Sequence, residues 1–225
     1  MSDGPDPLIE QLASLDPTAR RYAAEDLGDR HNARAVPALV KAVGDPDVAV
    51  REAAVDALVA IGGQAVSGLV APLLETEDVA LRNYACEILE RVGPESIDVL
   101  VAASNSASAD VRKFALDTLG KVARGCAGKC LEAVAAHLGD ENPNVAGSAA
   151  EALGHIGDSQ AIPHLANHLG DAPWMQLCVF SALSRIGGET ALKALSSADV
   201  GQMSPFTKHF YETALKVAKV SVKRS

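Results

Sequence analysis

The sequence predicts an all-α protein in which about seven two-helix repeats stack into an α-α superhelix, or α-solenoid. Apolar side chains at offsets -8, -4, -1, 0 and +3 from a recurring leucine form the one-sided stripe of an amphipathic helix. At 48% hydrophobic and 4% aromatic residues, the chain is too apolar for a disordered protein and too poor in rings for most β-sandwiches. The recurring leucine stands at Leu27, Leu58, Leu89, Leu119, Leu153 and Leu183, with a looser copy at Leu215.

Each repeat divides into a short helix and a longer one. The longer helix follows an Asp/Asn/Ser-Pro or acidic cluster, which supplies an N-cap, and it stops at a glycine. Pro46, Pro143, Pro173 and Pro205 lie near helix starts, where a missing amide hydrogen costs nothing. We therefore expect a single repeat domain over residues 1–225. Its repeats cover approximately residues 5–30, 35–62, 65–93, 96–124, 128–157, 160–187 and 189–221.

The segment from Asp45 to Gly62 follows the pattern D-P-D-x-x-V-R-x-A-A-x-x-A-L-x-x-I-G. This pattern resembles the HEAT-like repeat, of the kind also found in phycobilisome lyases. The resemblance covers nearly the whole chain and implies the solenoid fold. It says little about function, because this repeat family includes scaffolds, chromophore lyases, a metal-dependent hydroxylase and DNA glycosylases.

The same resemblance implies a structural ladder of arginines. In HEAT repeats an arginine seven residues before the key leucine commonly meets an aspartate six residues before it, and this pair links neighbouring repeats. Asp45 and Arg51 match that spacing, whereas Ser14, Thr76 and Ser106 stand where an acid would be wanted. The ladder arginines are Arg20, Arg51, Arg82 and Arg112.

Arg112 is the last arginine of the ladder, and the next repeat lengthens to 34 residues around residues 124–130. We expect a flexible joint or a change of curvature over residues 120–132.

A row of acids stands two residues before the key leucine, and its site points roughly opposite the apolar stripe. If the long helices line a concave surface, as the resemblance implies, the row faces a groove. One interpretation is that these acids only form ordinary i,i+4 pairs, such as Arg21 with Glu25. The other is that they attract a basic peptide. The row consists of Glu25, Asp56, Glu87, Asp117 and Glu151.

The sixth long helix, PWMQLCVFSALSRIG, carries an unusual apolar face of Trp174, Leu177 and Phe180. Exposed on a concave surface, these side chains would form a partner-binding hot spot. The alternative is that the last repeat, SPFTKHFYETAL, folds over and buries them.

Candidates for chemistry are weak. His137, His164 and His168 have helical spacings that could bring imidazoles to a zinc ion, but no acid or cysteine obviously completes the set. Cys126 and Cys130 lie near Arg124, and a nearby cation would lower a thiol pKa, although the C-x-x-x-C spacing is not a thioredoxin-type motif. We predict no catalytic residue, no cofactor and no metal.

Charge and composition narrow the function. The formal charge of -9 disfavours nucleic acid as a partner, and no stretch is apolar enough to span a membrane. Four cysteines and an N-terminus without a secretion signal favour a cytoplasmic location. We expect a non-enzymatic adaptor or scaffold that binds a basic or amphipathic segment of another protein. Self-association is an alternative for its partner, because the charge is unevenly distributed. The alternative function, suggested by resemblance alone, is a phycobilin-lyase-like or tetrapyrrole chromophore-protein chaperone.

Overall fold

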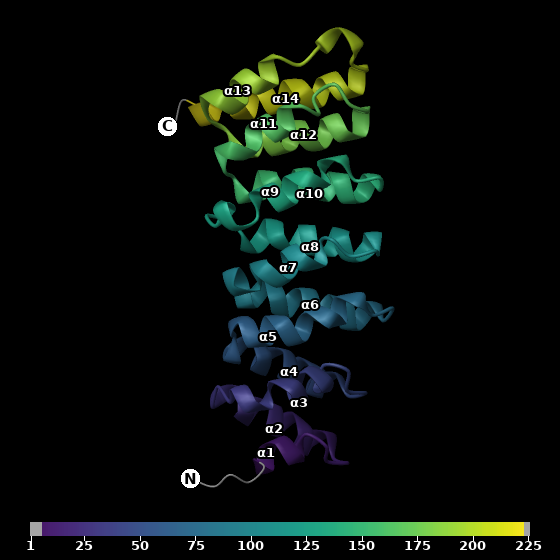
Figure 1. The fold of residues 1–225 in the computed structure, drawn as a ribbon, viewed down its shortest axis with the longest axis vertical. Helices are drawn as coiled ribbons and strands as arrows, with labels where there is room; N and C mark the ends of the chain where they lie inside the picture. Colours follow the sequence, from purple (N-terminus) through teal and green to yellow (C-terminus); the bar gives the residue numbers. More distant parts are fainter. Residues whose placement is uncertain (1–5, 223–225) are drawn as a thin grey trace. The chain divides into compact units, whose positions relative to one another are not determined.

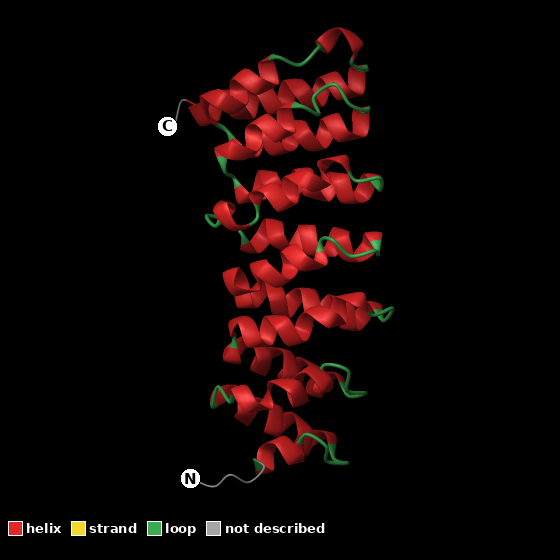
Figure 2. Ribbon diagram, in the orientation of Figure 1, coloured by secondary structure: helices red, strands yellow, loops and turns green. Residues whose placement is uncertain are grey.

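The long helices form one series along the chain. The computed structural model describes residues 6–222, apart from the side chains of residues 64, 65 and 127, and within this range it contains helices but no strand (Figure 2). This confirms the all-α prediction. The six well-spaced key leucines are all fully buried. The long helices are α2 (Pro17–Asp29), α4 (Val48–Ile61), α6 (Val79–Val92), α8 (Ala109–Val122), α10 (Pro143–Ile156), α12 (Pro173–Ile186) and α14 (Pro205–Val222) (Figure 1).

Shorter helical segments alternate with the long helices, and several of them run into a turn of 3-10 helix. The α-helical ones are α1 (Pro7–Gln11), α3 (Val36–Ala42), α5 (Gly63–Val70), α7 (Ile97–Ala103), α9 (Leu131–Ala135), α11 (Ile162–Ala166) and α13 (Gly188–Ser196). The 3-10 turns are η1 (Ala33–Ala35), η2 (Ala71–Glu75), η3 (Gly93–Ser96), η4 (Ala127–Lys129), η5 (Ala136–Gly139), η6 (Ser159–Ala161) and η7 (Val200–Gln202). The alternation of short and long helices confirms the predicted two-helix repeat.

Helix boundaries follow the capping residues of the sequence. Asp16, Asp47 and Asp78 each accept a hydrogen bond from the backbone N–H two residues later, which satisfies an amide that the helix leaves unpaired. Prolines open α10, α12 and α14. Four long helices stop at glycines with φ between 62° and 81°, a region that favours glycine. Helices α2 and α8 differ, because their C-cap residues are Arg30 and Ala123 and not glycines.

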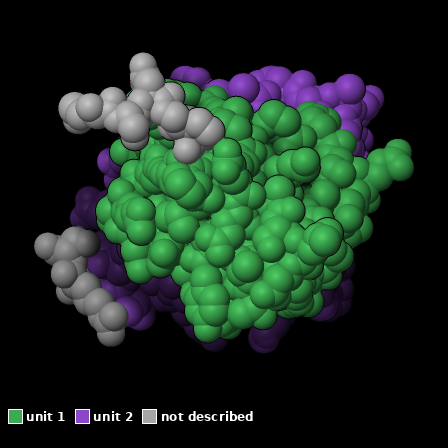
Figure 3. Space-filling model, turned by 90° about the horizontal axis from the view of Figure 1, so that it is seen from below, with its two compact units in different colours: residues 1–99 green, residues 100–225 purple. Residues whose placement is uncertain are grey.

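The chain divides into two compact units, Met1–Val99 and Leu100–Ser225, which Figure 3 colours separately. Residues 120–132, where we predicted a flexible joint or a change of curvature, lie inside unit 2 and not at the boundary between the units, and that expectation stays a prediction. The helices on either side of this segment, α8 and α10, pack closely on each other. The extra residues form the loop around η4 and do not separate the two helices.

Small residues set the spacing between successive long helices. Gly28 of α2 faces Ala57 of α4, Gly120 of α8 faces Ala152 of α10, and a Cβ added at either glycine would lie within 3 Å of the alanine backbone. Gly154 of α10 repeats the arrangement, because its Cβ would lie 2.7 Å from the Cα of Ala182 on α12. Helices α4 and α6 make a sparser contact, and there the same two registers hold Val59 and Ile88. Side-chain size at one register thus decides how closely two repeats approach.

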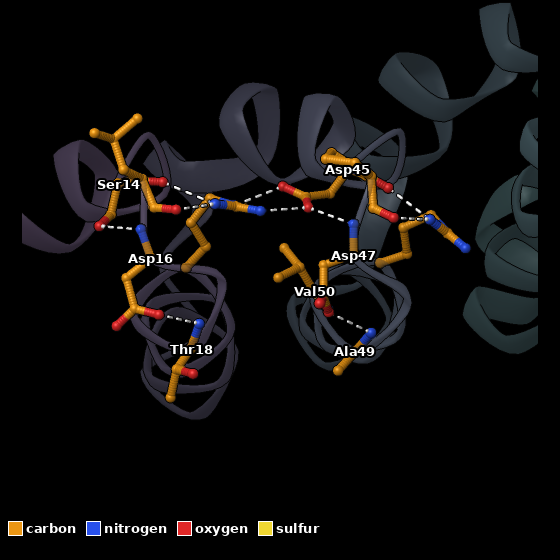
Figure 4. Close-up of polar contacts among 11 residues, drawn as sticks. Ser14, Asp16, Thr18, Asp45, Asp47, Ala49 and Val50 are labelled. Atoms are coloured by element: carbon orange, nitrogen blue, oxygen red, sulfur yellow. Dashed lines mark hydrogen bonds and ion pairs between the residues drawn. The ribbon is translucent and has the colours of Figure 1, made fainter.

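A bidentate ion pair joins the first two repeats. Arg20 of α2 donates through Nε and Nη2 to the carboxylate of Asp45, at 2.7 Å for each bond, and through Nη1 to the carbonyl of Ser14 at 2.8 Å (Figure 4). Hydrogen bonding to Arg20 holds the pKa of Asp45 below its usual range. Asp45 also accepts the backbone N–H of Asp47, so one carboxylate shapes the loop before α4 and ties it to α2.

The same connection recurs in unit 2. Arg112 of α8 donates to the carboxylate of Asp140 through two bonds of 2.9 Å, and through Nη1 to the carbonyls of Ser106 and Ala107. Hydrogen bonding to Arg112 lowers the pKa of Asp140. Asp140 stands six residues before Ala146, so its repeat supplies the acid without an arginine of its own.

The sequence-based pairing of Asp45 with Arg51 is therefore wrong. Arg51 uses the backbone carbonyls of Asp45 and Pro46, while the Asp45 carboxylate belongs to the arginine of the preceding repeat. An acid for Arg51 would have to stand at position 76, six residues before Arg82, but this position holds a threonine. Thr76 cannot bind a guanidinium in this way, and the Nε of Arg51 is buried without a hydrogen-bond partner. Arg82 itself is half-buried on α6.

We predict that Thr76→Asp stabilises the protein. Thr76 Oγ1 already accepts the N–H of Asp78, as Asp45 accepts the N–H of Asp47, so an aspartate keeps this turn and adds a carboxylate for Arg51. Thermal unfolding at pH 7 should shift upward by a few degrees. The shift should begin to decline as the pH falls below about 4 and should disappear only below the lowered pKa of the folded state, because a carboxylate whose pKa is lowered in the folded state stabilises only while it is ionised. Ser14→Asp, at the same turn position with no preceding arginine, is the control, and an equal shift there would contradict the ladder.

We also predict that Gly154→Ala destabilises the protein by about 1–3 kcal/mol, because the added methyl group forces α10 away from α12. Gly68→Ala on α5 is the matched control. A Cβ at Gly68 meets nothing within 4 Å, so alanine there should be neutral or stabilise the helix by up to about 1 kcal/mol. Urea unfolding measures both. Equal effects of the two substitutions would show that close helix contact is not what Gly154 provides.

Candidate functional site

A groove of unit 2 runs over α8, α10 and α12 and has a volume of about 570 Å³. Its floor is made by Gly147 and Ser148 of α10, which stand six and five residues before the key leucine. At the same two registers, α8 carries Lys113 and Phe114. Gly147 has no side chain and Ser148 has a small one, so a hollow opens on α10 next to helices that carry larger side chains.

Trp174 forms one wall of this groove and is 43% exposed. The last repeat therefore leaves the tryptophan open, while Leu177 beside it is half-buried. The prediction that Phe180 belongs to the same exposed face is wrong, because Phe180 is 1% exposed. Its ring packs edge-on against Tyr211 of α14, with centroids 5.4 Å apart. The last repeat thus covers one of the three apolar side chains that the sequence singled out.

Charged residues line the rest of the groove. Lys113 pairs with Asp117 at 2.6 Å, and Glu151, Lys121 and His155 also line it. Cys178 stands beside Gly147, and burial, followed by the nearby Glu151 charge, raises the pKa of its thiol. The thiol is therefore protonated at neutral pH and is a poor nucleophile.

The predicted row of acids lies on the exposed face of the long helices, but most of its members already have basic partners. In unit 1, Arg91 bridges Asp56 of α4 at 2.8 Å and Glu87 of α6 at 3.1 Å. Glu25 lies 3.6 Å from Arg21. Arg91 stands two residues after the key leucine, a register that sequence reasoning overlooked and that later holds Lys121, His155 and Arg185.

Unit 1 has a smaller groove of about 370 Å³ between α2 and α4. It is lined by the carboxylates of Glu25, Asp29, Glu52 and Asp56 and by one guanidinium, that of Arg21. No aromatic side chain lines it. The two grooves share a register but differ in character, since only that of unit 2 combines an aromatic wall with balanced charge.

The three histidines that were weak candidates for metal ligands do not converge on one point. His137 contacts Ser104, His164 lies 3.5 Å from Glu132, and His168 lies 2.7 Å from Asp171. Among the residues that the structure describes, no group of three or more His, Cys, Asp or Glu side chains could hold a metal ion. Burial raises the pKa of Cys130, and this opposes the activation that its basic neighbours suggested.

An apolar stripe on α14 went unnoticed in the sequence. Phe206, Phe210, Val217 and Val220 are 64%, 45%, 49% and 49% exposed, and their spacings of four, seven and three residues place them on one helix face. The rings of Phe206 and Phe210 lie 5.0 Å apart. The sequence contained this signal, because these four residues are apolar and their spacing places them on one helix face.

Within residues 6–222, no helix is both long enough and apolar enough to cross a bilayer.

Comparison with curated proteins finds relatives whose names refer to phycocyanin or phycocyanobilin. The chain is 26% identical to the uncharacterized phycocyanin operon protein Z of Pseudanabaena tenuis, over 79% of this chain and 93% of that protein. It is 33% identical to phycocyanobilin lyase subunit beta of Thermosynechococcus vestitus, over 46% of this chain and 49% of that subunit. It is 32% identical to phycocyanobilin lyase subunit alpha of a Picosynechococcus species, over 56% and 52%. The chain thus spans about half the length of each lyase subunit.

Comparison with solved structures and with families supports the fold. Importin beta matches over 96% of this chain and 37% of its own, with a TM-score of 0.61 and 15% identity, which shows a shared α-solenoid fold. A family model for HEAT repeats matches residues 5–87, 97–176 and 131–199. Together with the repeated long helices and the arginine connections, this match shows that the chain belongs to the HEAT repeat family.

Proposed function

We propose that this protein is a phycobilin-lyase-like chaperone that holds a linear tetrapyrrole in the groove of unit 2. The observation that carries the proposal is the groove itself, which Gly147 and Ser148 open next to Trp174. Its volume of about 570 Å³ lies within the range of small-molecule sites. Relatives named as phycocyanobilin lyase subunits and as a phycocyanin operon protein support this choice of ligand.

The lining of the groove suits such a ligand chemically. A linear tetrapyrrole is a flat conjugated chain with pyrrole N–H donors and two carboxylic acid side chains. Trp174 offers a ring against which the chain can stack, and Asp117 and Glu151 are acceptors for N–H groups. Because the Cys178 thiol is kept protonated, the proposal assigns to the groove the holding of the chromophore and no covalent step.

A second candidate function is the binding of a partner protein through the outer face of α14. The specific observation is the exposed stripe of Phe206, Phe210, Val217 and Val220, because exposed apolar patches mark interaction sites. Helix α14 also carries three exposed lysines, and they favour a partner that presents acids as well as an apolar strip. We propose a phycocyanin subunit as this partner, so that one chain carries the chromophore and contacts the protein that receives it. The lysines are Lys208, Lys216 and Lys219.

We predict that Gly147→Leu weakens binding of biliverdin, a linear tetrapyrrole, by roughly tenfold or more because its side chain fills the floor of the groove. The Cβ would lie 3.6 Å from the Sγ of Cys178, an ordinary contact, so the fold should tolerate the change. Trp174 is the single tryptophan of the chain, and quenching of its fluorescence measures binding directly.

The matched control is Asn83→Leu, which places the same side chain at the same register of α6. It should bind biliverdin as the wild type does. The proposal fails if the wild type shows no quenching and no change in the biliverdin spectrum, or if Gly147→Leu binds as tightly as the wild type.

For the second candidate, we predict that a variant with both Phe206→Ser and Phe210→Ser binds phycocyanin subunits at least about tenfold more weakly, because the exposed rings are the largest apolar groups of the stripe. Biolayer interferometry measures this. A variant with Val48→Ser and Val79→Ser removes two similarly exposed side chains from unit 1 and should bind normally. Equal binding by all three proteins would rule out the α14 face. Dimers of the wild type that the phenylalanine variant lacks would identify a second copy as the partner instead.

A further inference from the structure

Four basic side chains gather at one end of the unit 2 groove, where α8, α10 and α12 all finish. Lys121 and His155 line the groove, and Arg185 Nη1 lies 3.4 Å from His155 Nδ1. A Cβ at Gly120, next to Lys121, would be 3.5 Å from the His155 Cβ, so the ends of α8 and α10 touch. Arg124 follows α8 in the adjoining loop.

Acids also line the groove near this cluster. Glu151 stands one turn before His155 on α10, and the Lys113–Asp117 ion pair lines the groove as well. Partial burial of the ring, and then the positive charges of Arg185, Lys121 and Arg124, lower the pKa of His155 against the opposing effect of Glu151. His155 is therefore neutral at pH 7, and its ring lies close to three permanently charged basic side chains.

A structural explanation competes with a functional one. Lys121, His155 and Arg185 lie in the last turns of their helices, where positive charge is favourable beside unpaired carbonyls. That explanation accounts for each residue by itself. It does not account for a guanidinium that contacts an imidazole across two helices at the mouth of a groove.

We propose that Lys121, Arg124, His155 and Arg185 form an anion-binding subsite that takes the carboxylate groups of the groove's ligand. The proposal deepens the function proposed above and rests on it for the identity of the ligand. A carboxylate placed among these groups gains charge-assisted hydrogen bonds. It also fixes the direction in which a tetrapyrrole enters, with its acid side chains at the helix ends and its conjugated chain towards Trp174.

The test compares biliverdin with its dimethyl ester, which keeps the conjugated chain and loses both negative charges. Wild-type protein should bind biliverdin about tenfold more tightly than the ester. Arg185→Gln should lose most of this difference, Arg185→Lys should restore part of it, and the affinity for the ester should not change. Arg34→Gln removes a positive charge from an exposed site in unit 1 and is the control.

A second measurement does not need a tetrapyrrole. Succinate, a small dicarboxylate, should raise the pKa of His155 in the wild type, as seen by NMR titration of its ring, and should not do so in Arg185→Gln.

The outcomes separate the two proposals. If biliverdin and its ester bind equally and Arg185→Gln affects neither, the subsite is wrong while the tetrapyrrole function stands. If neither tetrapyrrole binds but succinate raises the pKa of His155, the anion subsite stands and the tetrapyrrole function is wrong. If Arg185→Gln only lowers the melting temperature, with no effect of succinate on His155, the cluster serves the helix ends alone.

Discussion

The size of the side chain at each register of the long helices controls the whole structure, because each helix can bury its apolar stripe only against its neighbours. Where glycine meets alanine, as at Gly28 and Ala57 or Gly154 and Ala182, two helices approach until their backbones nearly touch. Where α10 carries Gly147 and Ser148 on its outer side, the same reduction in size opens a groove. Small side chains thus have two effects at different registers of the repeat: they allow close helix packing, and they open the groove.

The polar contacts also recur at fixed registers of the repeat. The guanidinium of Arg20 bridges the loop before its own helix and the acid of the next repeat, and Arg112 does the same in unit 2. On the exposed face, acids two residues before the key leucine meet bases two residues after it, as Glu87 meets Arg91. This pairing leaves less free negative charge for steering a basic peptide than the acids alone suggested. Basic groups also gather around His155, which Arg185 contacts and whose pKa the charges of Arg185, Lys121 and Arg124 lower.

The repeat period, the helix order and the caps could be predicted from the sequence because they depend on residues close together in the chain. Asp47 caps α4 and Gly62 ends it for purely local reasons. Contacts between repeats were harder to assign. The Asp45 carboxylate was assigned to Arg51, six residues away, whereas it pairs with Arg20 across 25 residues. For Phe180 the sequence left exposure and burial by the last repeat as alternatives, and the structure shows that Tyr211 of that repeat covers it. The groove depends on small side chains of α10 that lie next to larger ones of neighbouring helices, and the sequence pattern did not show that these positions would form a groove. Site residues named from the sequence, such as Trp174 and Glu151, do line that groove, but their role in binding stays a prediction.

A crystal structure of the protein in complex with biliverdin tests the central claim most directly. The account predicts density for the tetrapyrrole over Gly147 and Ser148, with its conjugated chain against Trp174 and its carboxylates next to Arg185 and His155. Density on the acidic groove between α2 and α4, or on the outer face of α14, would contradict it, as would a protein that remains colourless after exposure to the pigment.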